Sequence, residues 1–334
     1  MANALRIGDH LAGRPDDLRK VNRPGPSLCP TRMDRTYSAI ILAGGDGTRL
    51  RSVTRAIAGD DRPKQFCPIL GEGTLLDQAR RRVGLVVAPE RTVISVTRTH
   101  ERFYRGSLAA CARETIVAQP GNRGTAPAIL YALLRLAVVA PGGATVILPS
   151  DHWVSDDAAF MARIEGALEA VGEHPDLVVL LGIDADRPEP EYGWIEPGDL
   201  VLGRSSWPVY RVRRFWEKPP RPVAERLMRA GCLWNSFVTV GAPAALRRLV
   251  RLAAPSVAAA FGQLYARLGT PSELEMADEV YASLSSVDFS RDILQVRPEH
   301  LAVLPVTGVA WNDLGSPERV TMSREMTSGQ LAMA

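Results

Sequence analysis

The sequence predicts an α/β fold in which a Rossmann-like, mostly parallel sheet carries helices on both faces. Short apolar runs at 39–42 and 145–148 are typical of buried parallel strands. Helical patterns separate such runs, and strands that alternate with helices at this interval favour a right-handed parallel sheet. Polar loops follow both runs directly, where open α/β folds bind their ligands. We therefore expect one ligand site at the carboxyl edge of the sheet.

The composition is typical of a globular protein that acts on small molecules. The chain has 334 residues, of which 46% are hydrophobic and 23% are charged. Its 40 basic and 37 acidic residues leave a net charge of +3, which gives no indication of a nucleic-acid partner. A basic site for a small anionic substrate fits this charge equally well.

Hydropathy and cysteine spacing indicate a cytoplasmic protein without a membrane partner. No apolar run reaches the ~18 residues that span a membrane, and the first residues lack the apolar core of a signal peptide. The four cysteines are scattered singly, at Cys29, Cys67, Cys111 and Cys232, without a CxxC pair. This spacing disfavours a zinc site and a disulfide framework, so we expect reduced thiols.

The remaining elements follow from their hydrophobic periods, in chain order. Helices are expected at 74–83, 101–112, 245–252 and 257–268, and further strands at 92–97, 115–117, 177–183, 210–216 and 301–305. The two late helices are rich in Ala, Leu and Arg and predict a helical cap that packs on the fold and carries no site.

A glycine-rich loop follows the first strand. Gly44, Gly45 and Gly47 allow the backbone to approach an anion closely, with N–H groups pointing at phosphate oxygens. Arg49 adds a forked donor and Lys64 a mobile charge, and both suit a polyphosphate. The loop therefore favours a nucleoside triphosphate, although the same pattern also fits a tight connection between a strand and a helix. It matches neither the dinucleotide GxGxxG motif nor the P-loop.

A second polar loop, at 119–129, leads into an apolar helix. Gly124 would let a flat base lie on the backbone, and the amide of Gln119 could meet the edge of that base. The alternative is a helix-capping loop with Thr125 as N-cap and Pro127 in the first turn. The residue types alone leave both interpretations open.

A carboxylate stands at the end of the strand at 145–148, in the segment Pro149-Ser150-Asp151-His152. Asp151 at this edge is well placed to hold Mg²⁺, which takes oxygen ligands together with waters and substrate phosphates. An aspartate after a strand is also a frequent helix N-cap, so the residue alone does not decide its role.

These loops resemble those of a known family. The segments GGDGTRL at 44–50 and RPKQF at 62–66 are similar to the signature of sugar-1-phosphate nucleotidyltransferases, and PKQF resembles the mannose-1-phosphate guanylyltransferases most. Further similar segments follow in the family's order, so the resemblance covers about 38–320; they lie at 119–129, 149–152, 188–195, 215–219, 232–237 and 311–316. There are two departures: the loop at 187–191 lacks the family's threonines, and Phe237 stands where the family's WNSG segment has glycine.

The resemblance implies a role for each matching residue. Catalysis is expected from Arg49, Lys64 and Asp151. The expected nucleotide-binding residues are Ala43, Gly44, Gly45, Gly47, Thr48, Gln119, Gly124 and Thr125. The sugar phosphate is expected to contact Gly193, Glu217, Lys218 and Asn235, and Mg²⁺ the carboxylates of Asp151 and Asp313.

The resemblance also implies the domain organisation. Residues 37–320 are expected to form the nucleotidyltransferase domain, with a nucleotide-binding half at about 37–150 and a sugar-binding and helical part at about 151–320. Residues 1–36 lack a sustained hydrophobic period and are expected to be a disordered extension, whose place in the native protein the sequence leaves open. A helical tail is expected at 321–334.

The implied function is the conversion of GTP and mannose 1-phosphate to GDP-mannose and pyrophosphate, by Mg²⁺-assisted in-line attack on the α-phosphate. The sequence leaves open another sugar 1-phosphate, such as a heptose or glucose, another nucleoside triphosphate, a non-catalytic sensor of a nucleotide sugar, and a homodimeric state. An NAD-dependent oxidoreductase is disfavoured, because the glycine spacing is wrong and no acidic residue ends the second strand.

Overall fold

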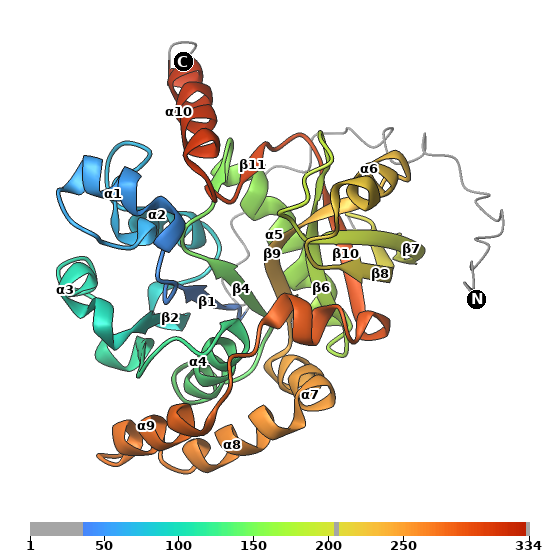
Figure 1. Ribbon diagram of the computed structural model, residues 1–334. Coiled ribbons are helices and arrows are strands. Elements are labelled where there is room, and N and C mark those ends of the chain that lie inside the picture. Colours follow the sequence, from blue (N-terminus) through green and yellow to red (C-terminus); the bar gives the residue numbers. More distant parts are fainter. Residues whose placement is uncertain (1–35, 204–206, 332–334) are drawn as a thin grey trace, which may run out of the picture.

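One nine-stranded sheet forms the centre of the molecule (Figure 1). The computed structural model describes residues 36–203 and 207–331. Across the sheet the strands follow the order β3 (Ile116–Gln119), β2 (Thr92–Thr97), β1 (Ser38–Leu42), β4 (Thr145–Pro149), β9 (Leu233–Gly241), β6 (Val178–Asp184), β10 (Leu301–Val306), β8 (Val209–Trp216) and β7 (Trp194–Leu202).

Most strands of this sheet run in the same direction. β1 pairs in parallel with β2 and β4, β2 with β3, and β6 with β10. Only β9 and β8 oppose their neighbours, so seven of the nine strands share one direction. The prediction of a mostly parallel sheet is confirmed, and β9 is the antiparallel strand that joins its two parallel parts.

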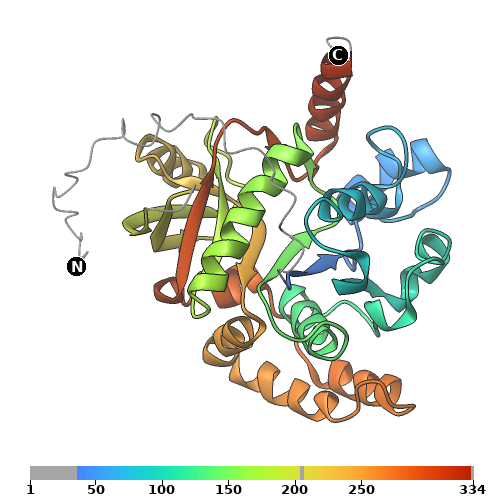
Figure 2. The same ribbon diagram turned by 180° about the vertical axis from the view of Figure 1, so that it is seen from behind.

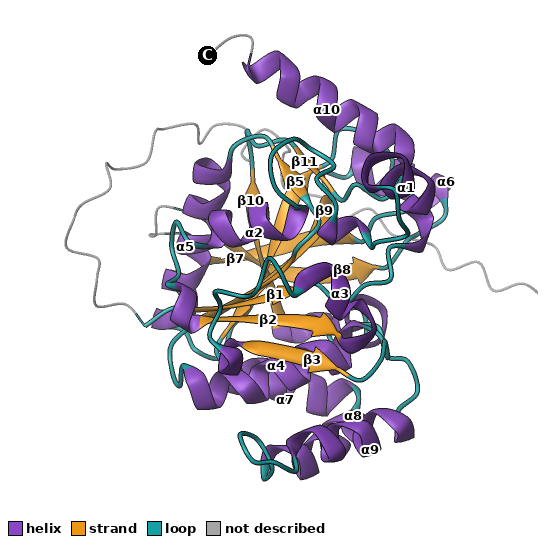
Figure 3. Cartoon of the chain, turned by 90° about the vertical axis from the view of Figure 1, so that its left-hand side faces the viewer, coloured by secondary structure: helices purple, strands orange, loops and turns teal. Residues whose placement is uncertain are grey.

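Helices cover both faces of the sheet (Figure 3). They are α1 (Arg51–Ala58), α2 (Leu75–Val83), α3 (Glu101–Tyr104), α4 (Thr125–Val139), α5 (Asp157–Glu173), α6 (Arg221–Arg229), α7 (Pro243–Ala253), α8 (Pro255–Tyr265), α9 (Glu273–Ser283) and α10 (Pro317–Leu331). Helices α2 and α5 lie on one face, and α4, α7, α8 and α9 on the other. From behind, the green helix α5 lies across the sheet and the orange helices α7 to α9 lie below it (Figure 2).

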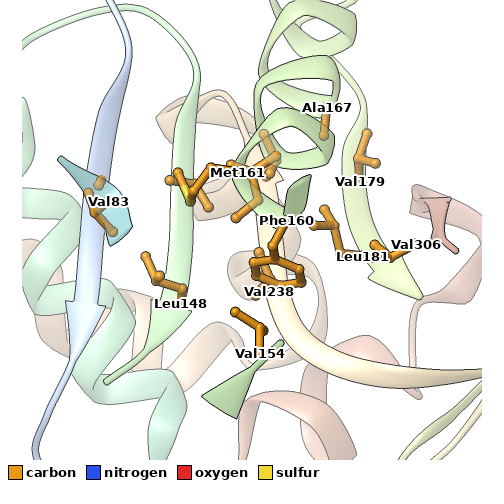
Figure 4. Packing of buried hydrophobic residues seen from close by; sticks show 14 of the residues in the cluster. Val83, Leu148, Val154, Phe160, Met161, Ala167, Val179, Leu181, Val238 and Val306 are labelled. Carbon is orange, nitrogen blue, oxygen red and sulfur yellow. The ribbon is translucent and has the colours of Figure 1, made fainter. Parts of the chain in front are cut away.

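The alternation of side chains along each strand divides the core into two clusters. In β1, Ala39 and Ile41 face the cluster under α2 and α5, whereas Ile40 faces the cluster under α4. Phe160 and Met161 of α5 point at the strands in the close view of the first cluster (Figure 4). Because both faces of the sheet are covered, the sequences of its central strands are continuous apolar runs.

A small second sheet lies beside the main one. It pairs β5 (Trp153–Val154) with β11 (Trp311–Asn312) in antiparallel register, with Asn312 opposite Trp153. This register brings the residue after Asn312 next to the end of β4, although 162 positions separate Asp313 from Asp151. The two predicted metal ligands are therefore placed by a pairing of only two residues per strand.

Most predicted elements are present within a residue or two of their expected bounds. The helix expected at 101–112 differs, because α3 ends at Tyr104 and turns follow through Gly106 and Ser107, which are weak helix formers. The extension predicted at 1–36 lies outside the described residues except at its end, and α10 covers most of the expected tail. No helix within the described ranges is long and apolar enough to cross a membrane.

Candidate active site

A polar cleft of about 450 Å³ opens at the carboxyl ends of β1 and β4. It brings together, from distant parts of the chain, the predicted residues Gly47, Thr48, Arg49, Lys64, Asp151, Gly193, Glu217, Lys218, Asn235 and Asp313. It is also lined by residues for which the sequence predicted no role, among them Glu191, Tyr192, Phe237, Asp288 and Ser290. The position agrees with the expected ligand site at this edge of the sheet.

Lys64 stands at the centre of the cleft and joins the two predicted metal ligands. Its Nζ lies 3.3 Å from Asp151 Oδ2 and donates hydrogen bonds to the backbone oxygens of Asp313 and Leu314, at 2.5 and 3.2 Å. The Lys64 side chain is only 13% exposed, so its charge acts in a partly desolvated setting. One cation therefore holds the end of β4 against the segment after β11.

The glycine-rich loop positions Lys64 by packing against it. A β-carbon on Gly47, where φ is 61°, would lie 2.9 Å from the backbone nitrogen of Lys64, so glycine permits the approach. The buried side chain of Gln65 fixes the loop from the other side, donating from Nε2 to the oxygens of Ala43 at 3.1 Å and Gly45 at 2.7 Å. The sequence motif PKQF thus supplies both the central cation and the residue that holds the loop.

The carboxylate of Asp313 is held by three donors on one oxygen. Oδ1 accepts from Arg319 Nη1 at 2.9 Å, from the Gly315 backbone at 2.9 Å and from the Tyr192 hydroxyl at 3.3 Å. Arg319 also pairs with Glu189 at 3.0 Å and covers the Tyr192 ring. Arg319 therefore ties the start of α10 to the loop before β7 and orients the carboxylate.

The charges around Asp313 keep it ionised near neutral pH. Burial would raise the pKa of Asp313, but the neighbouring His152, Arg319 and Lys64 outweigh burial and hold this pKa below the ordinary 3.8. Burial lowers the pKa of His152 to about 4, so its imidazole is uncharged near pH 7. Arg319 and Lys64 therefore stabilise the carboxylate at that pH, and His152 adds charge only in acid.

Each of the two carboxylates keeps one oxygen available to a cation. Within the described part of the chain, no hydrogen bond is donated to Asp151 Oδ1 or Asp313 Oδ2. The described part of the chain also contains no group of three or more His, Cys, Asp or Glu side chains that could enclose a metal. Two carboxylate oxygens without a closed cage fit Mg²⁺, which completes its shell with waters and substrate phosphates.

The other end of the cleft carries the residues predicted to bind a sugar phosphate. Burial raises the pKa of Glu217, opposed by Lys218, whose Nζ lies 3.7 Å from Glu217 Oε1. The Gly193 backbone oxygen accepts from the Asn235 backbone nitrogen at 2.8 Å, which joins the two segments in the cleft wall. Carboxylate, amide and ammonium groups therefore surround a space open to hydroxyls and an anion.

Arg49 lies at the mouth of the cleft rather than at its centre. Its guanidinium is 3.4 Å from Glu191 Oε2, and both side chains are more than half exposed. An ion pair this exposed contributes little to stability, so the guanidinium can exchange Glu191 for a phosphate at small cost. Glu191 belongs to the loop in which the sequence departs from the family pattern.

Gln119 is held in a buried hydrogen-bond network in this structure. Its Nε2 donates to Ser95 Oγ at 3.1 Å, and its Oε1 accepts from the Tyr281 hydroxyl at 3.1 Å. The side chain is 2% exposed and does not line the cleft. A contact between Gln119 and a base, as predicted, would require part of this buried network to be exchanged.

Gly124 and Thr125 contact a backbone segment that lies between α9 and β10. A β-carbon on Gly124, where φ is 85°, would lie 2.4 Å from the Val287 oxygen. Gly124 occupies the N-cap position of α4, and the Thr125 hydroxyl accepts from the Phe289 nitrogen at 2.7 Å instead. The alternative with Thr125 as N-cap is therefore wrong, because its hydroxyl holds the neighbouring segment. Neither residue lines the cleft.

Three residues that support the site were assigned no role from the sequence. Gln65, Tyr192 and Arg319 act by contacts with residues that lie 22, 121 and 130 positions away in the chain, which are Ala43, Asp313 and Glu189. No local signal marks these three residues, whereas the composition gives a further signal for the two predicted lysines: among 40 basic residues only three are lysines, and Lys64 and Lys218 both line the cleft. A lysine kept in an arginine-rich chain indicates a place where a compact point charge is needed.

Comparison with known proteins relates this chain to one family. A family model described as nucleotidyl transferase matches residues 38–325. The alginate biosynthesis protein AlgA of Pseudomonas syringae pv. tomato is 33% identical over 201 residues, 59% of this chain and 40% of that protein. The mannose-1-phosphate guanylyltransferase of Escherichia coli is 30% identical over 202 residues, 59% of this chain and 41% of that protein. The chain thus spans about two fifths of the length of these curated relatives.

A solved structure agrees with this fold over most of the chain. The crystal structure from Thermus thermophilus described as a mannose-1-phosphate geranyltransferase has a TM-score of 0.71 and 33% identity. The match covers 84% of this chain and 76% of that one. The predicted fold class is therefore confirmed in a second protein with the same arrangement.

Proposed function

The chain belongs to the nucleotidyl transferase family, and on that premise we propose that it converts GTP and mannose 1-phosphate to GDP-mannose and pyrophosphate. The observation that carries the proposal is the arrangement of Lys64 between Asp151 and Asp313, at the carboxyl ends of β1 and β4. The substrates are taken from the E. coli relative named as a mannose-1-phosphate guanylyltransferase.

The proposed reaction is an in-line displacement at the α-phosphorus. An oxygen of the sugar phosphate forms the new P–O bond, and the bond to the bridging oxygen breaks, so pyrophosphate leaves with the electron pair. Lys218 would orient the attacking phosphate, and Lys64 and Arg49 would stabilise the charge that develops on the α-phosphate and the leaving group. No side chain is required as a nucleophile.

Asp151 and Asp313 would hold Mg²⁺, through the carboxylate oxygens that accept no hydrogen bond from the described chain. When bound, this ion would neutralise phosphate charge and orient the two substrates. Lys64 already neutralises part of the carboxylate charge, so the site can form before the ion arrives.

Pyrophosphate release tests this function. The purified chain would be assayed with four nucleoside triphosphates against several sugar 1-phosphates, with Mg²⁺ and with EDTA. Release with GTP and mannose 1-phosphate, abolished by EDTA, is the expected result. Release with a different pair would keep the reaction but change the assigned substrates. If no pair gives release and the protein binds GDP-mannose, the result would favour the non-catalytic sensor.

We further propose a cytoplasmic location for the protein. Cys67, Cys111 and Cys232 are free thiols in the described structure. Unpaired cysteines suit a reducing compartment, where nucleoside triphosphates are also available. Fractionation of the cells that make the protein would test the location.

A further inference from the structure

Three non-glycine residues have a positive φ among the described residues, and all three line the cleft. They are Lys218 at 48°, Leu314 at 51° and Phe237 at 67°. Backbone of this kind is strained for residues with a β-carbon and concentrates at functional sites. Two of the three are accounted for: Leu314 presents its oxygen to Lys64, and Lys218 carries a cation at the sugar-phosphate end.

Phe237 needs a different explanation, because its main-chain contacts do not require an aromatic side chain. Its nitrogen donates to Asn235 Oδ1 at 3.1 Å, at an irregularity in the pairing of β9 with β6, where glycine would adopt the same φ without strain. The ring is partly buried and packs beside the Phe289 ring, with 6.3 Å between centroids. It lines the cleft together with Asp288 and Ser290.

Phe237 therefore adds an apolar residue to a wall of the cleft that Asp288 and Ser290 otherwise make polar. The neighbouring wall residues Glu217 and Asn235 offer hydroxyls a carboxylate and an amide, but a hydroxyl turned toward Phe237 meets no polar partner on that side chain. Burying an unpaired hydroxyl is unfavourable, whereas a C–H or methyl carbon packs well on a ring.

We propose that Phe237 is a specificity-determining residue that selects sugar 1-phosphates presenting a C–H or deoxygenated carbon, rather than a hydroxyl, to this wall of the cleft. The inference rests on the proposed function, since it assigns the substrate class of the same site. The strained φ is retained because glycine, which would relieve it, would also remove the ring.

Three substitutions separate the ring from the backbone strain. Phe237→Leu keeps apolar bulk, Phe237→Ala removes the bulk but keeps a β-carbon, and Phe237→Gly removes both the bulk and the strain. Each variant and the wild type would be assayed for kcat/KM with GTP, mannose 1-phosphate and its single-deoxy analogues. The measured quantity is the ratio of each deoxy analogue to mannose 1-phosphate.

For a deoxy analogue altered at one position of the sugar ring, we expect the wild-type kcat/KM ratio of analogue to mannose 1-phosphate to exceed that of the Ala and Gly variants by about 10-fold. This is the discrimination that one apolar group in a pocket provides. The Leu variant should keep the wild-type preference, and KM for GTP should change little in all four proteins. Equal ratios in all four proteins would overturn the inference. A change in the Gly variant alone would also overturn it, because backbone freedom rather than the ring would then set the preference.

A binding measurement distinguishes failure of this inference from failure of the proposed function. The rise in melting temperature caused by GDP-mannose and its deoxy analogues would be measured for the same four proteins. If no protein releases pyrophosphate, the proposed function fails. The inference still holds if one deoxy analogue of GDP-mannose stabilises the wild type and the Leu variant more than it stabilises the Ala and Gly variants. If no nucleotide sugar stabilises the wild type, or all stabilise the four proteins alike, the inference is wrong.

Discussion

Replacing Lys64 by methionine removes the central cation of the cleft while keeping an unbranched side chain of similar length. In the wild type, Nζ lies 3.3 Å from Asp151 Oδ2 and donates to the Asp313 and Leu314 backbone oxygens. The substitution therefore removes a charge from the proposed phosphate site and separates two segments that Lys64 joins. Activity and stability should both fall, but by different amounts.

The geometry of the ion pair sets the expected size of each effect. At 3.3 Å, two unit charges interact by about 5 kcal/mol at an effective dielectric constant of ~20. Desolvation of both groups offsets most of this, so we expect unfolding to become easier by about 1–3 kcal/mol. Loss of a preorganised charged donor to the transition state costs about 3–4 kcal/mol, so kcat should fall by about 10² to 10³-fold.

The assay is pyrophosphate release at saturating substrates, together with urea unfolding of the same preparations. Lys64→Arg keeps the charge, but its wider fork does not fit between two carbonyl oxygens, so we expect it also to lose most activity. Arg98→Met is the matched control: Arg98 pairs with Asp278, is 36% exposed and does not line the cleft. It should lose some stability and keep kcat.

A kcat of Lys64→Met within about threefold of the wild type would refute the central role of Lys64, because a barrier change of about 3 kcal/mol corresponds to more than ~100-fold. Loss of activity that follows only the unfolded fraction would refute it as well, since the residue would then be structural. The Arg98 variant shows how much activity is lost through stability alone.

Three further substitutions test the surroundings of the site. Arg319→Gln breaks two partly buried ion pairs and should cost about 3 kcal/mol at pH 7 in urea unfolding. Because Arg319 lowers the pKa of Asp313, part of this deficit should disappear as the pH falls below 3.8. A deficit that does not depend on pH would contradict the assignment. Glu217→Gln removes a carboxylate whose pKa is raised above 4.5 by burial. The variant should therefore be more stable than the wild type at pH 7 but not below pH 4.5, and its KM for the sugar phosphate should rise. Equal stability differences at both pH values would count against this prediction. Gly124→Ala places a β-carbon 2.4 Å from a backbone oxygen at a φ of 85°, and it should cost about 1–3 kcal/mol of stability and raise KM for GTP. The control Gly121→Ala has open space around the added β-carbon and should behave as wild type. Equal melting temperatures of the two variants would refute the contact.

Local patterns of the sequence predicted the elements and the residue types of the site. The run at 39–42 is apolar at every position because β1 is buried on both faces, and the glycines after it mark the loop that packs on Lys64. Asp151 follows a buried strand, so its place at the carboxyl edge follows from the strand direction alone. Such features depend on a few neighbouring residues, whose period and turn chemistry are visible in one sequence.

The tertiary structure decided which of these residues meet and how their side chains point. Asp313 reaches the site through the two-residue pairing of β5 with β11, which is too short to leave a hydrophobic period in the sequence. The buried network of Gln119 and the Arg319 pair with Glu189 join residues more than 100 positions apart. A left-handed φ at Phe237 is the opposite of what an aromatic residue predicts locally, and it occurs in β9 with a hydrogen bond to Asn235 and a contact with the Phe289 ring. The sequence by itself therefore determined which chemical groups stand at the ends of the strands, and long-range packing decided their partners and orientation, because those depend on contacts that no local pattern encodes.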